Sequence, residues 1–170
     1  MYDAKAKDEI SMRIVAVGDT HRDFMGLREL IEQQMDSTDL FIHTGDGERE
    51  LDDIRSLYPE LPLRAVCGNC DLYSSDPQVD LIDAGGVKIF VTHGHGFGVK
   101  YSVEELEQNA RRLGAAIVLF GHTHCQYYRY DEGLHLLNPG SLSHPRGTSR
   151  GYAVIEIQNG QILCNLVQLR

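Results

Sequence analysis

The 170-residue sequence lacks long hydrophobic runs, an excess of basic residues and a dense set of cysteines, and each shortage excludes a class of protein. No apolar stretch approaches the roughly 18 residues of a membrane helix, and no signal-peptide core is visible, so we expect a cytoplasmic protein without membrane contact. The 16 basic and 25 acidic residues leave a formal charge of −9, which argues against nucleic acid as a partner. A domain of this size and apolar content does not need disulfides, so the four cysteines indicate no disulfide framework.

Histidine, in contrast, is abundant and clustered. Six of the eight histidines lie between positions 93 and 144, and the pairs His93/His95 and His122/His124 are each separated by one residue. This density in a loop-rich region favours metal binding. His43 and His135 fall within expected strands, where we expect them to serve packing.

The apolar pattern predicts a single α/β domain over residues 12–170, preceded by a polar segment, residues 1–11, that we interpret as a disordered extension or an expression remnant. Expected strands cover 13–17, 40–43, 63–66, 79–84, 87–92, 116–120, 126–130, 134–137, 152–158 and 161–168, and expected helices cover 23–36, 48–57 and about 102–113. Turns at Gly85-Gly86 and Asn159-Gly160 indicate hairpins. Two mixed sheets packed face to face with helices outside, a four-layer α-β-β-α sandwich, would bury every apolar face.

Two helix starts carry capping signals. Asp23 is a candidate N-cap for the first helix. Ser102-Val103-Glu104-Glu105 has the spacing of a capping box, which predicts that the third helix begins at Ser102.

Five of the expected strands run directly into short clusters of Asp, His, Asn and Gly. The clusters are Gly18-Asp19-Thr20-His21, Thr44-Gly45-Asp46-Gly47, Gly68-Asn69-Cys70-Asp71, His93-Gly94-His95 and Gly121-His122-Thr123-His124. Each alone is weak evidence, since a turn accounts for any one of them. Ligands bind at the carboxyl ends of parallel strands, however, so the shared placement of all five predicts a site with two metal ions.

In this chain order the motifs resemble those of the calcineurin-like metallophosphoesterase superfamily. The Gly-Asn-Cys-Asp variant and the later Asn138-Pro139-Gly140-Ser141 are similar to the small YfcE-type phosphodiesterases of bacteria and archaea. The resemblance spans residues 12–170. It implies a phosphodiesterase in which a hydroxide held between two metals attacks phosphorus in line.

The resemblance also implies the ligands of two divalent ions. They are Asp19, His21 and His124 for the first ion, Asn69, His93 and His122 for the second, and Asp46 as the bridge between them. Imidazole, carboxylate and amide donors suit Mn²⁺, Ni²⁺, Co²⁺, Fe²⁺ or Zn²⁺, and the resemblance favours Mn²⁺.

Several neighbours of these ligands are candidates for the reaction itself. Asn69 would also contact substrate, and Asp71 would orient the Asn69 loop or a ligand imidazole. His95 would contact substrate or support a ligand, with a structural role as the alternative. Arg146 would hold a phosphate oxygen, with a solvated loop arginine as the alternative.

Cys70 is a departure from the wider superfamily, in which histidine often follows Gly-Asn and protonates the leaving oxygen. A thiol with a pKa of about 8.5 matches the needs of a general acid poorly at neutral pH. We therefore expect esters with acidic leaving groups, such as aryl phosphodiesters, to be hydrolysed fastest. Cys67 and Cys70 also form a C-x-x-C, but no second pair and no helix start accompany it, which argues against redox or zinc chemistry.

Two alternatives stay open beside a small phosphodiester as substrate. One is a phosphomonoesterase with the same metal ligands. The other is a protein-binding scaffold like the retromer subunit of this fold, although this chain keeps a metal-binding side chain at all seven ligand positions. A dimer or tetramer is also left open.

Overall fold

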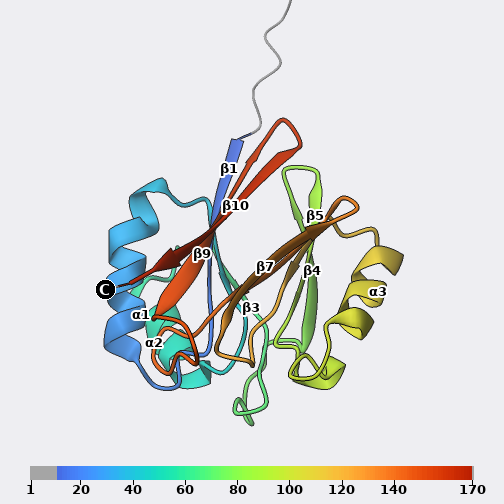
Figure 1. Ribbon diagram of the computed structural model, residues 1–170. Helices are drawn as coiled ribbons and strands as arrows, with labels where there is room; N and C mark the ends of the chain where they lie inside the picture. Colours follow the sequence, from blue (N-terminus) through green and yellow to red (C-terminus); the bar gives the residue numbers. More distant parts are fainter. Residues whose placement is uncertain (1–10, 170) are drawn as a thin grey trace, which may run out of the picture.

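The computed structural model describes residues 11–169, which form two five-stranded sheets packed face to face (Figure 1). The strands are β1 (Ser11–Val17), β2 (Leu40–His43), β3 (Leu63–Ala65), β4 (Val79–Ala84), β5 (Val87–Thr92), β6 (Ile117–Leu119), β7 (Gln126–Asp131), β8 (Leu134–Pro139), β9 (Gly151–Gln158) and β10 (Gln161–Gln168). The helices are α1 (Phe24–Gln34), α2 (Glu48–Leu57) and α3 (Glu104–Arg112), with short 3-10 helices η1 (Met35–Ser37) and η2 (His95–Phe97).

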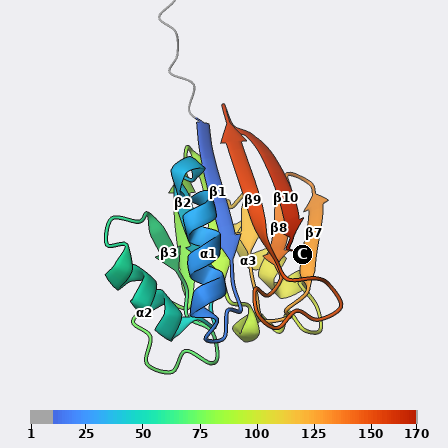
Figure 2. The same ribbon diagram turned by 90° about the vertical axis from the view of Figure 1, so that its left-hand side faces the viewer.

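Both sheets are mixed. The first has the order β10-β9-β1-β2-β3, in which β1, β2 and β3 are parallel and β9 is antiparallel to both of its neighbours. The second has the order β4-β5-β6-β8-β7, in which β5, β6 and β8 are parallel and the two edge strands are antiparallel. Helices α1 and α2 cover the outer face of the first sheet and α3 covers that of the second (Figures 1 and 2). The predicted four-layer sandwich is confirmed.

Side chains alternate along β1 between two cores. Ile14 and Ala16 pack between the sheets, whereas Val15 and Val17 pack against α1 and α2. A third core joins α3, through Leu106, to the second sheet. Strands buried on both faces read as continuous apolar runs, which is why β1 and β2 are visible in the sequence.

The direction of the strands separates the two ends of the molecule. The tight turns at Gly85-Gly86, Glu132-Gly133 and Asn159-Gly160, all with positive φ, lie at one end (Figure 1). The parallel strands finish at the other end, where the polar clusters follow them. All five clusters therefore meet at one end of the sandwich.

Most element bounds agree with expectation to within one or two residues. β1 begins at Ser11, which pairs with Gln158, one residue before the expected start of the domain. Of the extension expected over residues 1–11, residues 1–10 lie outside the described residues and Ser11 belongs to β1. Asp23 is the N-cap of α1, as predicted, and its Oδ1 accepts from Gly26 N at 2.9 Å.

The capping box predicted at 102–105 forms only in its serine half. Helix α3 begins at Glu104 with Val103 as its N-cap and no capping side chain at that position. In the preceding turn the amides of Tyr101 and Ser102 both donate to Gly98 O. Ser102 therefore lies one residue before the N-cap position, which Val103 occupies. Its hydroxyl accepts from Glu104 N at 3.1 Å, which is the bond expected of the capping serine, whereas the Ser102 amide bonds Gly98 O and not a glutamate side chain. Within residues 11–169 no helix has the length and apolar character needed to cross a membrane.

Candidate metal centre

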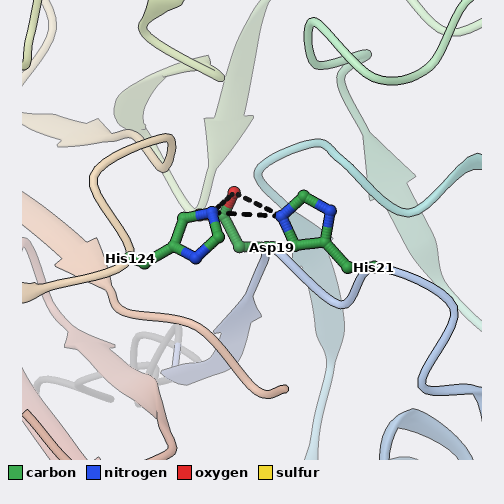
Figure 3. A group of neighbouring side chains, drawn as sticks. All are labelled: Asp19, His21 and His124. Atoms are coloured by element: carbon green, nitrogen blue, oxygen red, sulfur yellow. Dashed lines mark hydrogen bonds and ion pairs between the residues drawn. The ribbon is translucent and has the colours of Figure 1, made fainter. Parts of the chain in front are cut away.

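Three candidate ligands meet where β1 and β6 end (Figure 3). The Nε2 atoms of His21 and His124 are 3.0 Å apart, and Asp19 Oδ1 lies 3.7 Å from the first and 3.3 Å from the second. Asp19 is fully buried and His124 nearly so. This arrangement brings together the three residues expected for the first ion.

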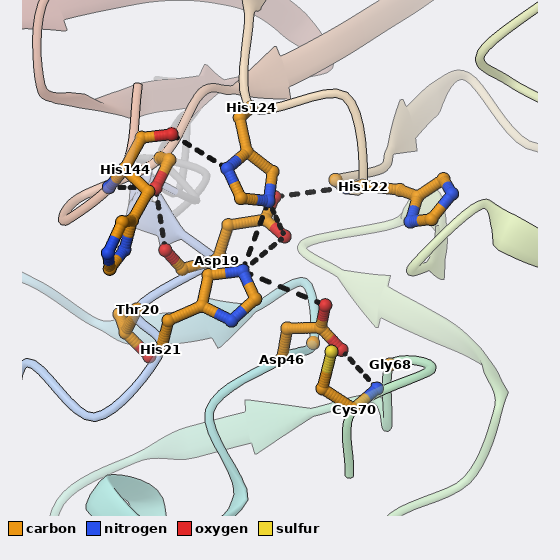
Figure 4. Close-up of polar contacts among 12 residues, drawn as sticks. Asp19, Thr20, His21, Asp46, Gly68, Cys70, His122, His124 and His144 are labelled. Carbon is orange, nitrogen blue, oxygen red and sulfur yellow. Dashed lines mark hydrogen bonds and ion pairs between the residues drawn. The ribbon is translucent and has the colours of Figure 1, made fainter. Parts of the chain in front are cut away.

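Asp46 lies between this group and the histidines that follow β5 and β6. Its Oδ2 is 3.8 Å from His21 Nε2 and 3.3 Å from His93 Nε2, and His93 Nε2 is 3.2 Å from His122 Nδ1. Figure 4 places His21 and His122 on opposite sides of the Asp19 carboxylate. The position of Asp46 between the two groups is the one expected of a bridging carboxylate.

Protonation in this cluster follows from the packing of its charges. Burial favours the neutral acid at Asp46, but contacts with His93 and with the Cys70 amide hold the pKa of the Asp46 carboxyl below its ordinary value. Burial, followed by repulsion from His93, lowers the pKa of His122 to about 4. A carboxylate and a neutral imidazole are the states that bind a cation.

The backbone at the site is strained. Five of the seven candidate ligands have a positive φ, between 41° and 69°. They are Asp19, His21, Asp46, His122 and His124. Non-glycine residues enter this region at a cost of about 1–3 kcal/mol each, and such residues concentrate at functional sites.

Two ligand imidazoles are fixed by main-chain carbonyls. His93 Nδ1 donates to Thr44 O at 2.9 Å, and His124 Nδ1 donates to His144 O at 2.7 Å. Each bond leaves the Nε2 lone pair directed into the cluster, which is the usual arrangement of a metal-binding histidine.

His43, expected to serve packing, belongs to a buried polar network beneath the ligand loops. Gly45 N donates to His43 Nδ1 at 3.1 Å, so the neutral ring carries its proton on Nε2 and donates it to Thr20 Oγ1 at 3.0 Å. Thr20 donates in turn to Glu50 Oε1 at 2.6 Å. Burial lowers the pKa of His43, which favours this neutral ring. The network ties the Asp19–His21 loop to α2, and no local signal in the sequence points to it.

The Asn138–Ser141 motif supports two ligand loops from behind. Ser141 Oγ donates to Asp19 O at 2.7 Å, and Asn138 Nδ2 donates to Gly121 O at 2.9 Å. Both side chains are fully buried. The motif therefore positions the backbone beside Asp19 and His122.

Asp71 also acts on the backbone. Its Oδ2 accepts from Asp46 N and Gly68 N, both at 2.7 Å, and its Oδ1 accepts from Glu48 N at 2.9 Å. It thus holds the Asn69 loop, as expected, and the Asp46 loop as well, which was not expected.

Asn69 and Cys70 lie at the exposed side of the cluster. The only side-chain hydrogen bond of Asn69 within residues 11–169 is from Nδ2 to Cys70 Sγ, at 3.4 Å, so no hydrogen bond ties its amide to His93 or His122. Cys70 Sγ lies within 4.8 Å of donor atoms of His21 and Asp46. Burial and the nearby Asp46 carboxylate raise the pKa of Cys70 to about 11.

His95 lies beside His93, and Arg146 lies beside His124. The His95 ring lies 5.5 Å from the His93 ring, and its Nδ1 is buried without a hydrogen-bond partner among the described residues. Arg146 is exposed, and its amide donates to His124 O at 2.9 Å. His144, which the sequence did not single out, has its ring edge-on to His21 at 5.6 Å.

The donor set fits divalent metal ions. Asp19 Oδ1 is buried and has no hydrogen-bond partner within residues 11–169, although three imidazole nitrogens lie within 4.0 Å of it. A buried carboxylate oxygen without a partner is costly unless a cation lies against it. Carboxylates with imidazoles suit Mn²⁺, Fe²⁺, Co²⁺, Ni²⁺ and Zn²⁺.

Residues 12–160 match the profile of the calcineurin-like phosphoesterase superfamily domain. A probable metallophosphoesterase of Bacillus subtilis, YsnB, is 33% identical over 87% of this chain and 86% of its own length. The crystal structure of a predicted phosphoesterase from Streptococcus pneumoniae superposes with a TM-score of 0.82 at 32% identity, over 93% of this chain and 90% of that one. The chain belongs to the calcineurin-like phosphoesterase superfamily.

More distant structures share the fold. They include the Escherichia coli phosphoesterase YfcE (TM-score 0.65, 19% identity, 92% of this chain and 100% of that one) and an archaeal phosphodiesterase (0.71, 20%, 92% and 100%). Vacuolar protein sorting 29 of Cryptosporidium parvum is equally close in fold (0.74, 18%, 94% and 98%). Enzymes and a sorting protein thus share this fold. The fold alone does not distinguish the two functions, so the function has to be inferred from the geometry of the site.

Proposed function

We propose that this chain is a metal-dependent phosphodiesterase that hydrolyses small phosphodiesters at the centre described above. The observation that carries the proposal is the convergence of Asp19, His21 and His124 on one side of Asp46 and of His93 and His122 on the other. Two ions, Mn²⁺ by preference, would be held by these residues with Asp46 between them, and Asn69 would join the second set after its amide turns from Cys70.

Bound divalent ions supply Lewis acidity toward phosphate oxygens and lower the pKa of water, which provides a nucleophile near neutral pH. The chain's own residues would position the ions and balance their charge. Asp19 and Asp46 balance the cationic charge, and the carbonyls of Thr44 and His144 hold two imidazoles in their binding tautomer. Arg146 lies beside His124, its guanidinium has no partner among the described residues, and it would hold a phosphate oxygen.

The test is an assay of protein reconstituted with Mn²⁺ on bis(p-nitrophenyl) phosphate and p-nitrophenyl phosphate. We expect the diester to be hydrolysed faster than the monoester, and Asp46→Asn to lower kcat by at least about 10²-fold, because it removes a charge between the two ligand groups. Asp53→Asn, on the exposed face of α2, is the matched control and should be neutral. Unchanged activity in Asp46→Asn would contradict the proposal, and a preference for the monoester would replace diesterase by monoesterase.

The position of Cys70 near the centre leads to a second prediction, which concerns how the rate depends on the leaving group. With its pKa raised to about 11, the thiol stays protonated but is a weak proton donor, so esters of acidic phenols should react much faster than alkyl esters. Cys70→His should flatten the dependence of log kcat on leaving-group pKa across a series of aryl methyl phosphates. Equal slopes in the two proteins would remove Cys70 from the reaction.

A scaffold resembling the sorting protein is the remaining alternative. It predicts no hydrolysis with Mn²⁺, Ni²⁺, Co²⁺, Fe²⁺ or Zn²⁺. The convergence of two carboxylates and four imidazoles at the centre favours the enzyme.

A further inference from the structure

A cleft of about 500 Å³ opens from the metal centre along the loop that joins β3 to β4. Its inner end is lined by His21, Asp46 and Cys70, and its outer part by Arg22, Arg49, Leu72 and Tyr73. The β3–β4 loop protrudes at the end of the sandwich where the parallel strands finish (Figure 1). The cleft extends well beyond the space that a single phosphate group fills.

The acidic residues of this cleft are already engaged. Glu50 accepts from Thr20 Oγ1 and Arg22 N, Asp71 accepts from three backbone amides, and Glu48 Oε2 accepts from Tyr73 N at 3.3 Å. These bonds use the carboxylates to hold the loops. The guanidinium groups of Arg22 and Arg49 are the cationic groups of the lining, and they are available to meet a ligand.

The arginines of the cleft are unusual in this chain. Among residues 11–169 the guanidinium groups that form no hydrogen bond or ion pair are those of Arg22, Arg49 and Arg146. All three flank the metal centre: Arg22 follows His21, Arg49 lines the cleft, and the Arg146 amide bonds to His124 O. The other arginines of the described part are paired. Free guanidinium groups gathered around one centre favour a ligand with more than one anionic group.

Tyr73 and Leu72 form the outer wall, and their side chains are 91% and 79% exposed. Their backbone is nevertheless fastened, because Tyr73 N donates to Glu48 Oε2 and Asp71 is bonded to the amides of Asp46, Glu48 and Gly68. A tyrosine whose backbone is held by such bonds and whose ring is open to solvent offers a surface on which a planar ring stacks.

We infer that this cleft binds the non-reacting arm of a nucleotide substrate, with its base against Tyr73 and a further phosphate at Arg22 and Arg49. This inference rests on the proposed function, because it names the substrate class of the same centre. The substrate would be a phosphodiester that joins a nucleoside to a second anionic group. The reacting phosphorus would lie at the metal centre, inward of both arginines.

The first test compares AMP with ribose 5-phosphate, two probes that differ only in the base. The full chain, reconstituted with Mn²⁺, is titrated calorimetrically with each. AMP should bind about tenfold more tightly, Tyr73→Ala should bring the ratio close to one, and Tyr73→Phe should restore it, since stacking needs the ring and not the hydroxyl. If either probe is hydrolysed, the ratio of Michaelis constants takes the place of the ratio of dissociation constants.

Tyr101→Ala is the matched control, because Tyr101 is 96% exposed and lies outside the cleft, in the segment before α3. Its AMP preference should equal that of the wild type. A wild-type ratio near one, or a ratio lost in Tyr101→Ala and kept in Tyr73→Ala, would overturn the inference.

The second test addresses the further phosphate. ADP should bind more tightly than AMP, and Arg49→Gln should reduce that preference by about fivefold to tenfold without changing the AMP to ribose 5-phosphate ratio. Arg112→Gln, at the end of α3, is the control. An ADP preference that Arg49→Gln leaves intact would contradict the role of the arginines.

These measurements separate the two proposals. Failure to hydrolyse any ester together with Tyr73-dependent AMP binding would refute the phosphodiesterase and support the nucleotide cleft. Hydrolysis of bis(p-nitrophenyl) phosphate together with equal binding of AMP and ribose 5-phosphate would do the reverse.

Discussion

Gly68 packs directly against the Asp46 carboxylate, and a side chain at this position has no room. A Cβ on Gly68 would lie 2.0 Å from Asp46 Oδ1 and 2.6 Å from Asp46 N. The close approach allows one carboxylate, that of Asp71, to bond both Gly68 N and Asp46 N. At the scale of single residues, the position of Asp46 therefore depends on a neighbour that has no side chain.

Gly68→Ala should displace the Asp46 carboxylate. Because a shift of about 1 Å in a catalytic group costs on the order of 10²-fold in rate, we expect kcat to fall by about that factor, with a loss of about 1–3 kcal/mol in the free energy of unfolding. Gly96→Ala, where nothing lies within 4 Å of the added Cβ, is the control. Diester hydrolysis and urea unfolding measure the two effects, and wild-type kcat in Gly68→Ala would show that Asp46 is not held as described.

Residues of the centre differ in how far the sequence alone predicts them. Asp19, Asp46 and His124 follow strands in recognisable motifs, so their convergence could be predicted from the ends of parallel strands. His43 could not be assigned in this way. Its bonds to Gly45 and Thr20 depend on how α2 brings Glu50 beneath the ligand loops, and the same histidine inside a strand is equally consistent with simple packing.

At the scale of elements, the loop after β8 holds two other loops in place. Ser141 Oγ donates to Asp19 O and accepts from the amides of Ser143 and His144, and it is completely buried. His144 in turn provides the carbonyl that fixes His124. One hydroxyl group thus connects two ligands of the same predicted ion.

Ser141→Ala should remove the acceptor of the Ser143 and His144 amides and leave Asp19 O with the Ser143 hydroxyl, at 3.2 Å, as its remaining side-chain donor among the described residues. We expect a loss of about 1–3 kcal/mol in the free energy of unfolding, together with about 10–100-fold weaker Mn²⁺ binding, because the group supports ligands without touching the ion. Thermal unfolding and a metal titration measure the two. Ser37→Ala removes an exposed hydroxyl that bonds Gln34 O, and it should change neither. Weakened stability with unchanged metal affinity would limit Ser141 to a structural role.

The elements themselves were largely predictable, because strands buried on both faces leave continuous apolar runs and the hairpins carry glycine turns. The start of α3 was not. The sequence around Ser102 has the spacing of a capping box, but the turn from Gly98 to Ser102 places the first helical residue at Glu104. The spacing of residues 102–105 gives no information about the hydrogen bonds that close the turn before the helix.

At the scale of the whole molecule, the centre is a concentration of negative charge in an acidic protein. Asp19 and Asp46 are 0% and 3% exposed, and the formal net charge is −9. Burial of carboxylates is unfavourable without a compensating cation. Metal binding and the stability of the fold should therefore be linked.

The effect of Asp19→Asn on the free energy of unfolding should change sign when metal is added. In EDTA we expect the free energy of unfolding to rise by about 1 kcal/mol, because the substitution removes a buried charge whose Oδ1 lacks a hydrogen-bond partner within residues 11–169. With Mn²⁺ at about 100 times its dissociation constant the wild type gains about 2.7 kcal/mol, a gain that the variant should lose. Denaturant unfolding in both buffers checks this. The same sign in both would mean that Asp19 does not bind the ion.

The separation of the two ends of the sandwich has a practical consequence. The hairpin turns at Gly85-Gly86, Glu132-Gly133 and Asn159-Gly160 lie opposite the metal centre (Figure 1). Exposed tight turns tolerate inserted sequence better than packed elements do. A peptide tag, a fluorophore or a surface tether placed at Asn159-Gly160 would leave the cleft facing solution. An immobilised form of this protein should therefore admit its substrates as freely as the molecule in solution.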